Sequence, residues 1–285
     1  MLSRPPDFLM IRKLRHVGSL GLLALALSPA LHAMSNESVQ TPAAASDEQV
    51  LDLPLAHGDH QRVLYAAPAH PLATLVMLPG GAGDVGIARD GDLRHDNNFV
   101  VRTRGLWLAL GYAVLIPDAL DHANLRGVRS SPEYAALVAD LVAYAHTRAS
   151  GPVFLLGTSQ GSIAAMNGAA HAKAGDIAGV ILTESVSRMG GSHETVFDAS
   201  PAEVRAPALV VANHDDACNV APPQDAPRIA AAMSHSPKVQ VEYLSGGISH
   251  SHKACGSLTP HGYYGIEQAV VNLIARWMAQ TKAGE

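Results

Sequence analysis

Residues 153–161 read Val-Phe-Leu-Leu-Gly-Thr-Ser-Gln-Gly, and this stretch decides the fold. Its first four residues form a short apolar run, and its last five match the pattern G-x-S-x-G around Ser159. The alanine-rich residues 160–173 that follow predict a helix. A serine between a buried strand and a helix occupies a sharp turn, in which small residues on either side avoid clashes. Ser159 is therefore the candidate nucleophile, and a glycine-rich turn without chemistry is the alternative interpretation.

Short apolar runs alternate with helical patterns along the rest of the chain. This alternation predicts an α/β fold with a mostly parallel central sheet and helices on both faces. The close spacing of the two runs at 180–182 and 209–211 leaves little room for a large lid domain. The predicted strands are residues 62–66, 74–78, 112–116, 153–156, 180–182, 209–211 and 239–244. The predicted helices are residues 99–110, 160–173 and 263–278, and a further one that opens at 131–133 and carries an apolar stripe as far as residue 142.

The composition describes a globular chain. Of its 285 residues 48% are hydrophobic, and its 25 glycines and 18 prolines occur without a repeat, which excludes disordered and collagen-like sequence. Two cysteines are too few for a disulfide-dense scaffold or a multi-cysteine zinc fold. The net charge of −5 argues against a nucleic-acid partner, because phosphate binding needs a basic face.

The first 33 residues predict a secretory signal peptide. A charge-free apolar run at 17–27 is followed by small residues up to Ala33 and is preceded by four basic residues, Arg4, Arg12, Lys13 and Arg15. The run is shorter than the roughly 18–20 residues of a membrane span, which makes a membrane anchor the less favoured alternative. We therefore expect a periplasmic or secreted protein without a stable membrane anchor after cleavage.

Signal cleavage changes how the remaining chain is interpreted. Residues 34–60 are expected to form a flexible leader, and residues 61–285 a single domain. Without the first 33 residues, the 20 basic and 25 acidic residues fall to 16 and 24, which is a net charge of −8. An oxidising compartment also favours a disulfide between Cys218 and Cys255, which would close a loop of about 38 residues.

The apolar run at 74–78 ends in Pro79-Gly80-Gly81-Ala82-Gly83. An acyl-transfer enzyme needs backbone N–H donors where the oxyanion develops, and a glycine-rich loop brings its backbone close. Gly81 N–H is one candidate donor, and Gln160 N–H, directly after the nucleophile, is the other. A phosphate-binding loop is the alternative, but the stretch lacks a Walker lysine and the G-x-G-x-x-G spacing.

A serine nucleophile needs a base that is itself oriented by an acid. Asp215 and Asp216 follow the run at 209–211, and Asp216 is preferred because the loop must leave the strand before it turns back. Asp215 stays open as an alternative, as does Glu184, which follows the run at 180–182.

Three histidines follow the last predicted strand: His250, His252 and His261. His261 stands directly before Gly262 and the final predicted helix, where a short loop can hold a base rigidly. His261 is the favoured base, and His250 remains an alternative. His250 and His252 resemble a metal-binding pair that, with Asp215 or Asp216, would suit a metal-dependent hydrolase, although no third ligand lies near them in the sequence.

Over residues 62–278 the chain resembles the α/β-hydrolase superfamily, whose members carry their nucleophile, acid and histidine in the order seen here. It is most similar to small, lidless dienelactone-hydrolase-like esterases, through Leu78-Pro79-Gly80-Gly81, Asp216-Ala217-Cys218 and His261-Gly262-Tyr263. Two features depart from that pattern: Pro79 stands where many members have histidine, and Ser159 stands where dienelactone hydrolase itself uses cysteine.

The resemblance implies a hydrolase that cleaves an ester of a small acyl substrate with Ser159, His261 and Asp216, without a cofactor or a metal. A peptidase, an amidase or a thioesterase would use the same three residues, because specificity lies in the loops at 84–98, 119–131 and 185–206. A non-catalytic binding protein on a hydrolase scaffold is the alternative from another class. The sequence leaves the substrate and the oligomeric state open.

Overall fold

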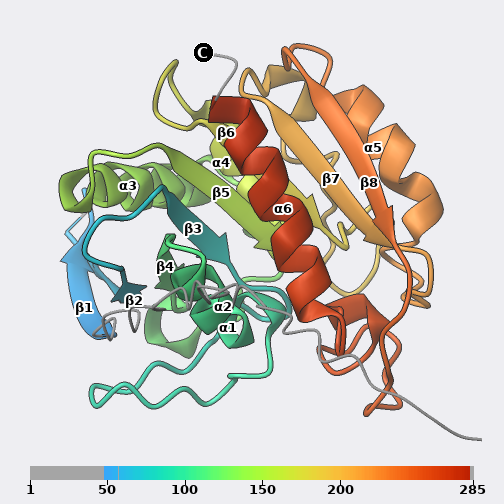
Figure 1. Cartoon of the computed structure of the whole chain (residues 1–285), viewed down its shortest axis with the longest axis horizontal. Helices are drawn as coiled ribbons and strands as arrows, with labels where there is room; N and C mark the ends of the chain where they lie inside the picture. The colour runs from blue at the N-terminus through green and yellow to red at the C-terminus, as the bar shows by residue number, and fades with distance from the viewer. Residues whose placement is uncertain (1–47, 57, 283–285) are drawn as a thin grey trace, which may run out of the picture. The chain divides into compact units, whose positions relative to one another are not determined.

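In the computed structural model, which describes residues 48–56 and 58–282, eight strands form one sheet in the order β1-β2-β4-β3-β5-β6-β7-β8 (Figure 1). From β4 to β8 neighbouring strands run parallel, whereas β2 pairs antiparallel with β4 and β1 antiparallel with β2. The described residues all belong to one compact unit, Pro42–Glu285. The strands are β1 (Gln49–Pro54), β2 (His60–Ala66), β3 (Thr74–Leu78), β4 (Ala113–Pro117), β5 (Val153–Thr158), β6 (Gly179–Thr183), β7 (Ala208–Asn213) and β8 (Val239–Leu244).

The burial of each strand follows from its place in the sheet. Every residue of β3, β4, β5, β6 and β7 is buried, which explains why these strands read as continuous apolar runs rather than as alternating patterns. The edge strand β8 is half-buried along its whole length and alternates in the sequence as VQVEYL.

Helices cover both faces of the sheet, and each face has its own apolar core. One core packs α3, α4 and α5 against the strands, and the other packs α1, α2 and α6. In Figure 1 α6 crosses the near face of the sheet and α4 lies behind it. The helices are α1 (Phe99–Arg102), α2 (Arg104–Ala109), α3 (Pro132–Arg148), α4 (Gly161–His171), α5 (Ala226–Ala232) and α6 (Glu267–Lys282), with short 3₁₀ turns η1 (Leu120–His122), η2 (Pro201–Glu203), η3 (Pro223–Asp225) and η4 (Pro260–Gly262).

This architecture confirms the predicted α/β fold with a mostly parallel sheet. Between β6 and β7, where a lid domain would have to be inserted, the only helical segment described is the single turn η2. The absence of a large lid leaves the carboxyl ends of β5 to β8 uncovered by any inserted domain.

The structure corrects the prediction of a flexible leader at 34–60. Residues 49–54 are strand β1 and pair with β2 along their whole length, and β2 itself begins at His60. The predicted signal peptide at 1–33 and the leader residues 34–47 lie outside the described residues.

Helix boundaries also differ from the predictions. The helix predicted at 99–110 is broken at Thr103, whose hydroxyl donates to the carbonyl of Phe99. The last helix begins at Glu267 rather than at residue 263, because Tyr263 takes a left-handed conformation that ends the turn η4. Helix α5 was not predicted, because its seven residues are too few to show a helical repeat.

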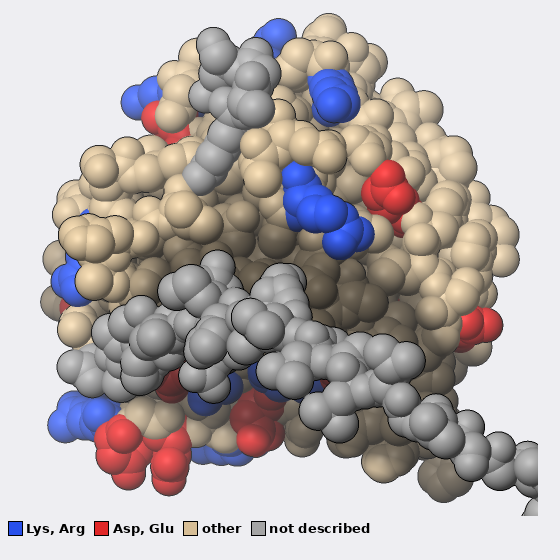
Figure 2. Space-filling view, viewed as in Figure 1, with Lys and Arg blue, Asp and Glu red and all other residues tan. Residues whose placement is uncertain are grey.

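Within the described part of the chain, no helix combines the length and the apolar character that a bilayer span requires. On the face shown in Figure 2, basic and acidic side chains lie in small separate groups between larger areas of other residues.

Candidate active site

Ser159 occupies the turn between β5 and α4, at the carboxyl end of a central strand of the sheet. Its φ of 51° lies in the left-handed region, which residues with a Cβ rarely adopt. The Ser159 N–H donates to the carbonyl of Thr183 on the neighbouring strand β6 at 2.9 Å. The turn is therefore held by the sheet, and its strained residue carries the candidate nucleophile.

The two glycines of the G-x-S-x-G motif are required by close backbone contacts. A Cβ on Gly157 would lie 2.2 Å from the carbonyl oxygen of Gly161, and a Cβ on Gly161 would lie 2.0 Å from that of Leu78. Such distances are well inside van der Waals contact, so only glycine fits at either position. The motif thus packs the start of α4 directly against the end of β3.

His261 faces Ser159 from the loop after β8. Its Nε2 lies 2.9 Å from Ser159 Oγ, and its Nδ1 lies 2.8 Å from Asp216 Oδ2. The hydroxyl of Thr259 accepts a hydrogen bond from His261 N–H and contacts the carbonyls of Ala254 and Gly256. The ring is buried, and its loop is braced by these contacts, which fixes the imidazole between serine and carboxylate.

Asp216 is the aspartate that reaches the histidine. Its side chain is fully buried, and its other oxygen, Oδ1, accepts from Cys218 N–H at 2.7 Å. Asp215, the sequence alternative, instead accepts from Gly246 N–H at 2.6 Å. His250, the alternative base, packs its ring against Tyr264, with 5.0 Å between ring centroids. The structure therefore brings Ser159, His261 and Asp216 together, and places Asp215 and His250 elsewhere.

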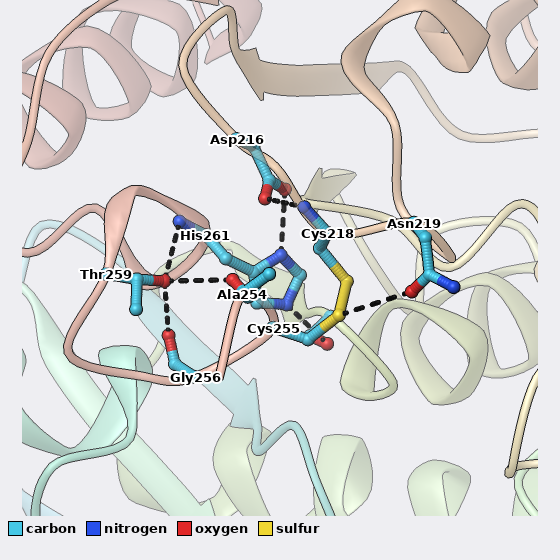
Figure 3. Close-up of a disulfide and its surroundings, with 9 residues drawn as sticks. Asp216, Cys218, Asn219, Ala254, Cys255, Gly256, Thr259 and His261 are labelled. Atoms are coloured by element: carbon cyan, nitrogen blue, oxygen red, sulfur yellow. Dashed lines mark hydrogen bonds and ion pairs between the residues drawn. A yellow bond between two sulfur atoms is a disulfide. The ribbon is translucent and has the colours of Figure 1, made fainter. Parts of the chain in front are cut away.

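A disulfide joins the loop after β7 that carries Asp216 (the acid loop) to the loop after β8 that carries His261 (the histidine loop) (Figure 3). Cys218 and Cys255 are bonded with a Cα–Cα distance of 4.6 Å, as the cysteine positions predict. The side-chain amide of Asn213, at the end of β7, adds two hydrogen bonds across the same gap, to the carbonyls of Gly246 and Pro260. The loops that carry Asp216 and His261 are thus connected both covalently and by hydrogen bonds.

The two candidate oxyanion donors lie on adjacent segments beside Ser159. Gly81 takes a φ of 61°, and Gln160 precedes the first turn of α4. Neither N–H donates to an acceptor among residues 48–56 and 58–282. Free amides next to the nucleophile, one of them at a helix N-terminus, are what stabilisation of a developing negative charge requires.

Arg129 links these two segments, and the sequence contained no signal for it. Its guanidinium donates to the carbonyl of Gly81 at 3.0 Å and to that of Pro79 at 3.3 Å, and it also donates to the side-chain oxygen of Gln160 at 3.3 Å. Arg129 is 1% exposed, and burial lowers the pKa of its side chain. Its backbone is fixed by Glu194, which accepts from Arg129 N–H.

The cleft over Ser159 is small, with a volume of about 80 Å³. Its walls come from the glycine-rich loop after β3, from the start of α1 and from the histidine loop, and Phe99, Cys255 and Ser257 line it. A larger, more apolar cavity of about 240 Å³ lies between the β1–β2 turn, the loop after β4 and the first turns of α3, and none of Ser159, His261 and Asp216 lines it. The space beside the candidate nucleophile therefore suits a short group.

Two clusters among the described residues bring together three side chains of metal-binding type: Asp84 with Asp118 and His122, and Glu184 with Asp216 and His261. In the first cluster, both oxygens of Asp118 already accept backbone hydrogen bonds from residues 85–87. His250 and His252 belong to neither cluster, so the metal-dependent alternative finds no ligand set around them in the described chain.

The sequence matches no protein-family model. A search of curated proteins also found no match.

Solved structures do match. The chain is similar to a dienelactone hydrolase from Anabaena variabilis, with a TM-score of 0.58 and 13% identity over 82% of this chain and 98% of that one. It is similar to an esterase from Pyrococcus furiosus, with a TM-score of 0.57 and 12% identity over 82% of this chain and 93% of that one. It is also similar to Est1E from Butyrivibrio proteoclasticus, with a TM-score of 0.55 and 14% identity over 83% and 99%. At such low identities the likeness shows the fold alone, and the fold is that of the α/β hydrolases.

Proposed function

We propose that the protein is a serine hydrolase that cleaves carboxylic esters of small molecules with short acyl groups. The observation that carries the proposal is the hydrogen-bonded chain from Ser159 Oγ through His261 to Asp216, with distances of 2.9 and 2.8 Å. A buried carboxylate that orients an imidazole against a hydroxyl is the arrangement that converts a weak nucleophile into a reactive one.

The proposed reaction has two steps. Ser159 Oγ attacks the carbonyl carbon while His261 Nε2 takes the hydroxyl proton, and the amides of Gly81 and Gln160 stabilise the oxyanion. The intermediate collapses as His261 returns the proton to the leaving alcohol, which leaves an acyl group on Ser159. Water then attacks the acyl carbonyl while His261 takes a proton from it, and His261 returns that proton to Ser159 Oγ as the bond to the acyl group breaks and the carboxylic acid leaves.

The small cleft is the basis for proposing a short acyl group. Its volume of about 80 Å³ is below the roughly 300 Å³ at which pockets for drug-sized ligands begin. We expect p-nitrophenyl acetate and butyrate to be cleaved with a kcat/KM at least about tenfold above that of the decanoate, because the walls of this cleft obstruct a long acyl chain. A preference for the decanoate would contradict this acyl preference.

The serine mechanism is tested with Ser159→Ala and a fluorophosphonate probe. The probe should label the wild type at Ser159 and should not label the variant, and the variant should lose at least about 10³-fold in kcat. A folded wild type that takes no label would support the non-catalytic binding protein. Matched ester, anilide and thioester substrates would separate the esterase from the amidase and thioesterase alternatives.

The assignment of the acid is tested with a neighbouring pair of variants. Asp216→Asn is expected to lower kcat by about 10³- to 10⁴-fold, because the amide cannot hold the imidazole in its reactive tautomer. Asp215→Asn removes the same charge one residue away and should stay within about threefold of wild type. Equal losses in the two variants would contradict the special role of Asp216.

We further propose that the protein works outside the cytosol. The basic and apolar segment at 1–33 and the Cys218–Cys255 disulfide both support export, because disulfides persist in oxidising compartments. Mass spectrometry of the protein recovered from the periplasm or the medium should find an N-terminus near Met34. An intact N-terminus on cytosolic protein would refute export.

A further inference from the structure

Glu184 is a buried acidic residue that the proposed reaction does not use. It directly follows β6, at the edge of the sheet where Ser159 and Asp216 also lie, and it is 1% exposed. Its φ of 44° is left-handed, and its N–H donates to the carbonyl of Val211 on β7 at 3.2 Å. The backbone is therefore held in a costly conformation that turns this residue toward the acid loop.

The carboxyl groups of Glu184 and Asp216 and the ring of His261 meet inside the protein. Each offers an atom, and these three atoms all lie within 4.8 Å of one another. The phenol of Tyr263 and the backbone of Asn213 are the other groups that face Glu184. The Tyr263 hydroxyl gives its proton to the carbonyl of Val211 at 3.0 Å, so it has no second proton for the carboxyl group of Glu184.

The hydrogen-bond partners distinguish the two carboxyl groups. Both oxygens of Asp216 accept, one from Cys218 N–H and one from His261 Nδ1. Neither oxygen of Glu184 has a hydrogen-bond partner among the described residues, so no donor stabilises a negative charge there. An ionised carboxylate buried without donors is far too costly to persist, whereas a protonated one needs only an acceptor for its O–H. Asp216 is therefore the anion, and Glu184 the neutral acid.

Burial, followed by the neighbouring charge of Asp216, raises the pKa of Glu184 well above its ordinary value. Two carboxyl groups this close do not both ionise, since each negative charge opposes the other. The direction of this shift agrees with the assignment made from the hydrogen bonds.

We propose that Glu184 is a positioning residue for the candidate group Ser159, His261 and Asp216: its protonated carboxyl group presents its O–H to the Asp216 carboxylate across a gap of at most 4.8 Å, which steadies that carboxylate against His261 without adding a second negative charge. This role rests on the proposed hydrolase function. Neutrality is essential to it, because a second anion beside the ring would favour the imidazolium over the neutral imidazole. A protonated base cannot accept the proton of Ser159.

Two substitutions test the proposal, with Glu203→Gln on the exposed turn η2 as the matched control. Glu184→Gln keeps the size and a donor and has no charge, so kcat should stay within about threefold of wild type. Its acidic limb in the pH profile of kcat/KM should also stay within about 0.3 units of wild type. Glu184→Leu has no donor and should lower kcat by about tenfold or more while KM changes little.

Each contrary result overturns a definite part of the proposal. If Glu184 were ionised, Glu184→Gln would remove a charge beside His261 and move the acidic limb to lower pH by about one unit or more. If Glu184→Leu matched wild type in kcat, Glu184 would have no positioning role. Should Glu184→Leu fail to fold, the pH profile of Glu184→Gln still decides the proposal.

An infrared measurement separates this inference from the proposed function. Wild type at neutral pH should show the carbonyl stretch of a buried protonated carboxyl, and Glu184→Gln should lack it while Glu203→Gln retains it. If wild type cleaves no ester and takes no fluorophosphonate, the proposed function fails, and the positioning role fails with it. If wild type is active but lacks the infrared band, only the inference about Glu184 is wrong.

Discussion

Arg129 places a buried guanidinium between the two segments that carry the candidate oxyanion donors. Its bonds to Gly81 and to the side chain of Gln160 act on residues of the proposed oxyanion hole rather than on the substrate. A guanidinium has a planar fork of donors that can contact several acceptors at once, which lysine cannot reproduce.

Arg129→Met is therefore expected to lower kcat by about ten- to a hundredfold while KM changes little, because the donors lose their alignment in the transition state. Arg129→Lys should recover only part of this loss. Arg126→Met, on an exposed residue of the same loop, serves as the control and should match wild type. Steady-state kinetics on a short-chain ester measure all three, and an unchanged kcat in folded Arg129→Met would refute the role.

At the residue scale the sequence predicts which side chains meet but not what surrounds them. Ser159, Asp216 and His261 each follow a strand, and the carboxyl ends of parallel strands share one edge, so their meeting could be inferred. The contacts of Arg129 and the missing donors around Glu184 depend on how buried loops pack. No short-range pattern in a single sequence records that packing.

At the scale of elements, the site is built from loops that follow β3, β5, β7 and β8. The disulfide joins two of them across 37 residues of sequence, and Asn213 reinforces the same connection. Loops without secondary structure would otherwise be the most mobile parts of the site. We infer that the cross-link contributes both to stability and to the alignment of Asp216 with His261.

The double variant Cys218→Ser/Cys255→Ser should be less stable by about 3–4 kcal/mol, as expected for closure of a loop of this length. Its kcat should fall more than its KM rises, since the acid and the base lose alignment together. Urea unfolding and ester kinetics, each compared with the wild type kept oxidised, measure the two effects. A variant with full activity and full stability would contradict the role assigned to the disulfide.

A helix or strand can be predicted from the sequence when its own residues determine where it begins and ends. The bounds of β3 and β8 agree with the predicted ranges, because their apolar or alternating patterns end at clear turn signals. The sequence does not predict strand β1, because QVLDLP includes an acid and a proline. The strand lies at the edge of the sheet, where its side chains are mostly exposed or half-buried and leave no continuous apolar run. Its existence depends on pairing with β2, a contact that the segment does not encode alone.

At the scale of the whole molecule, Glu184 makes the stability of the fold depend on pH. Below its ordinary pKa of 4.5 Glu184 is protonated in both the folded and the unfolded chain, so its titration does not change the free energy of unfolding. As the pH rises, the unfolded chain releases this proton while the folded protein keeps it, so the folded state loses stability until the raised pKa is reached. Each pH unit between these two pKa values lowers the free energy of unfolding by about 1.4 kcal/mol.

Glu184→Gln removes this dependence. The free energy of unfolding of the variant, minus that of wild type, should therefore grow more positive as the pH rises above the ordinary pKa of a glutamate, up to the raised pKa of Glu184. Urea unfolding at several pH values measures the difference, and Glu203→Gln should show no such trend. A difference that stays constant over this range would mean that the pKa of Glu184 is not raised in the folded protein.

The left-handed conformation of Ser159 implies a trade-off between the stability of the fold and the proposed activity, set by a single backbone torsion. A Cβ at a φ of 51° costs the folded state on the order of 1 kcal/mol, and glycine avoids most of that cost. Ser159→Gly should thus resist urea better than Ser159→Ala by up to about 1 kcal/mol, although both lack the nucleophile. Equal stability of the two would mean that the turn is relaxed. If the difference is found, the folded state loses stability by placing a serine at this turn, and selection for heat resistance alone would replace the proposed nucleophile with glycine.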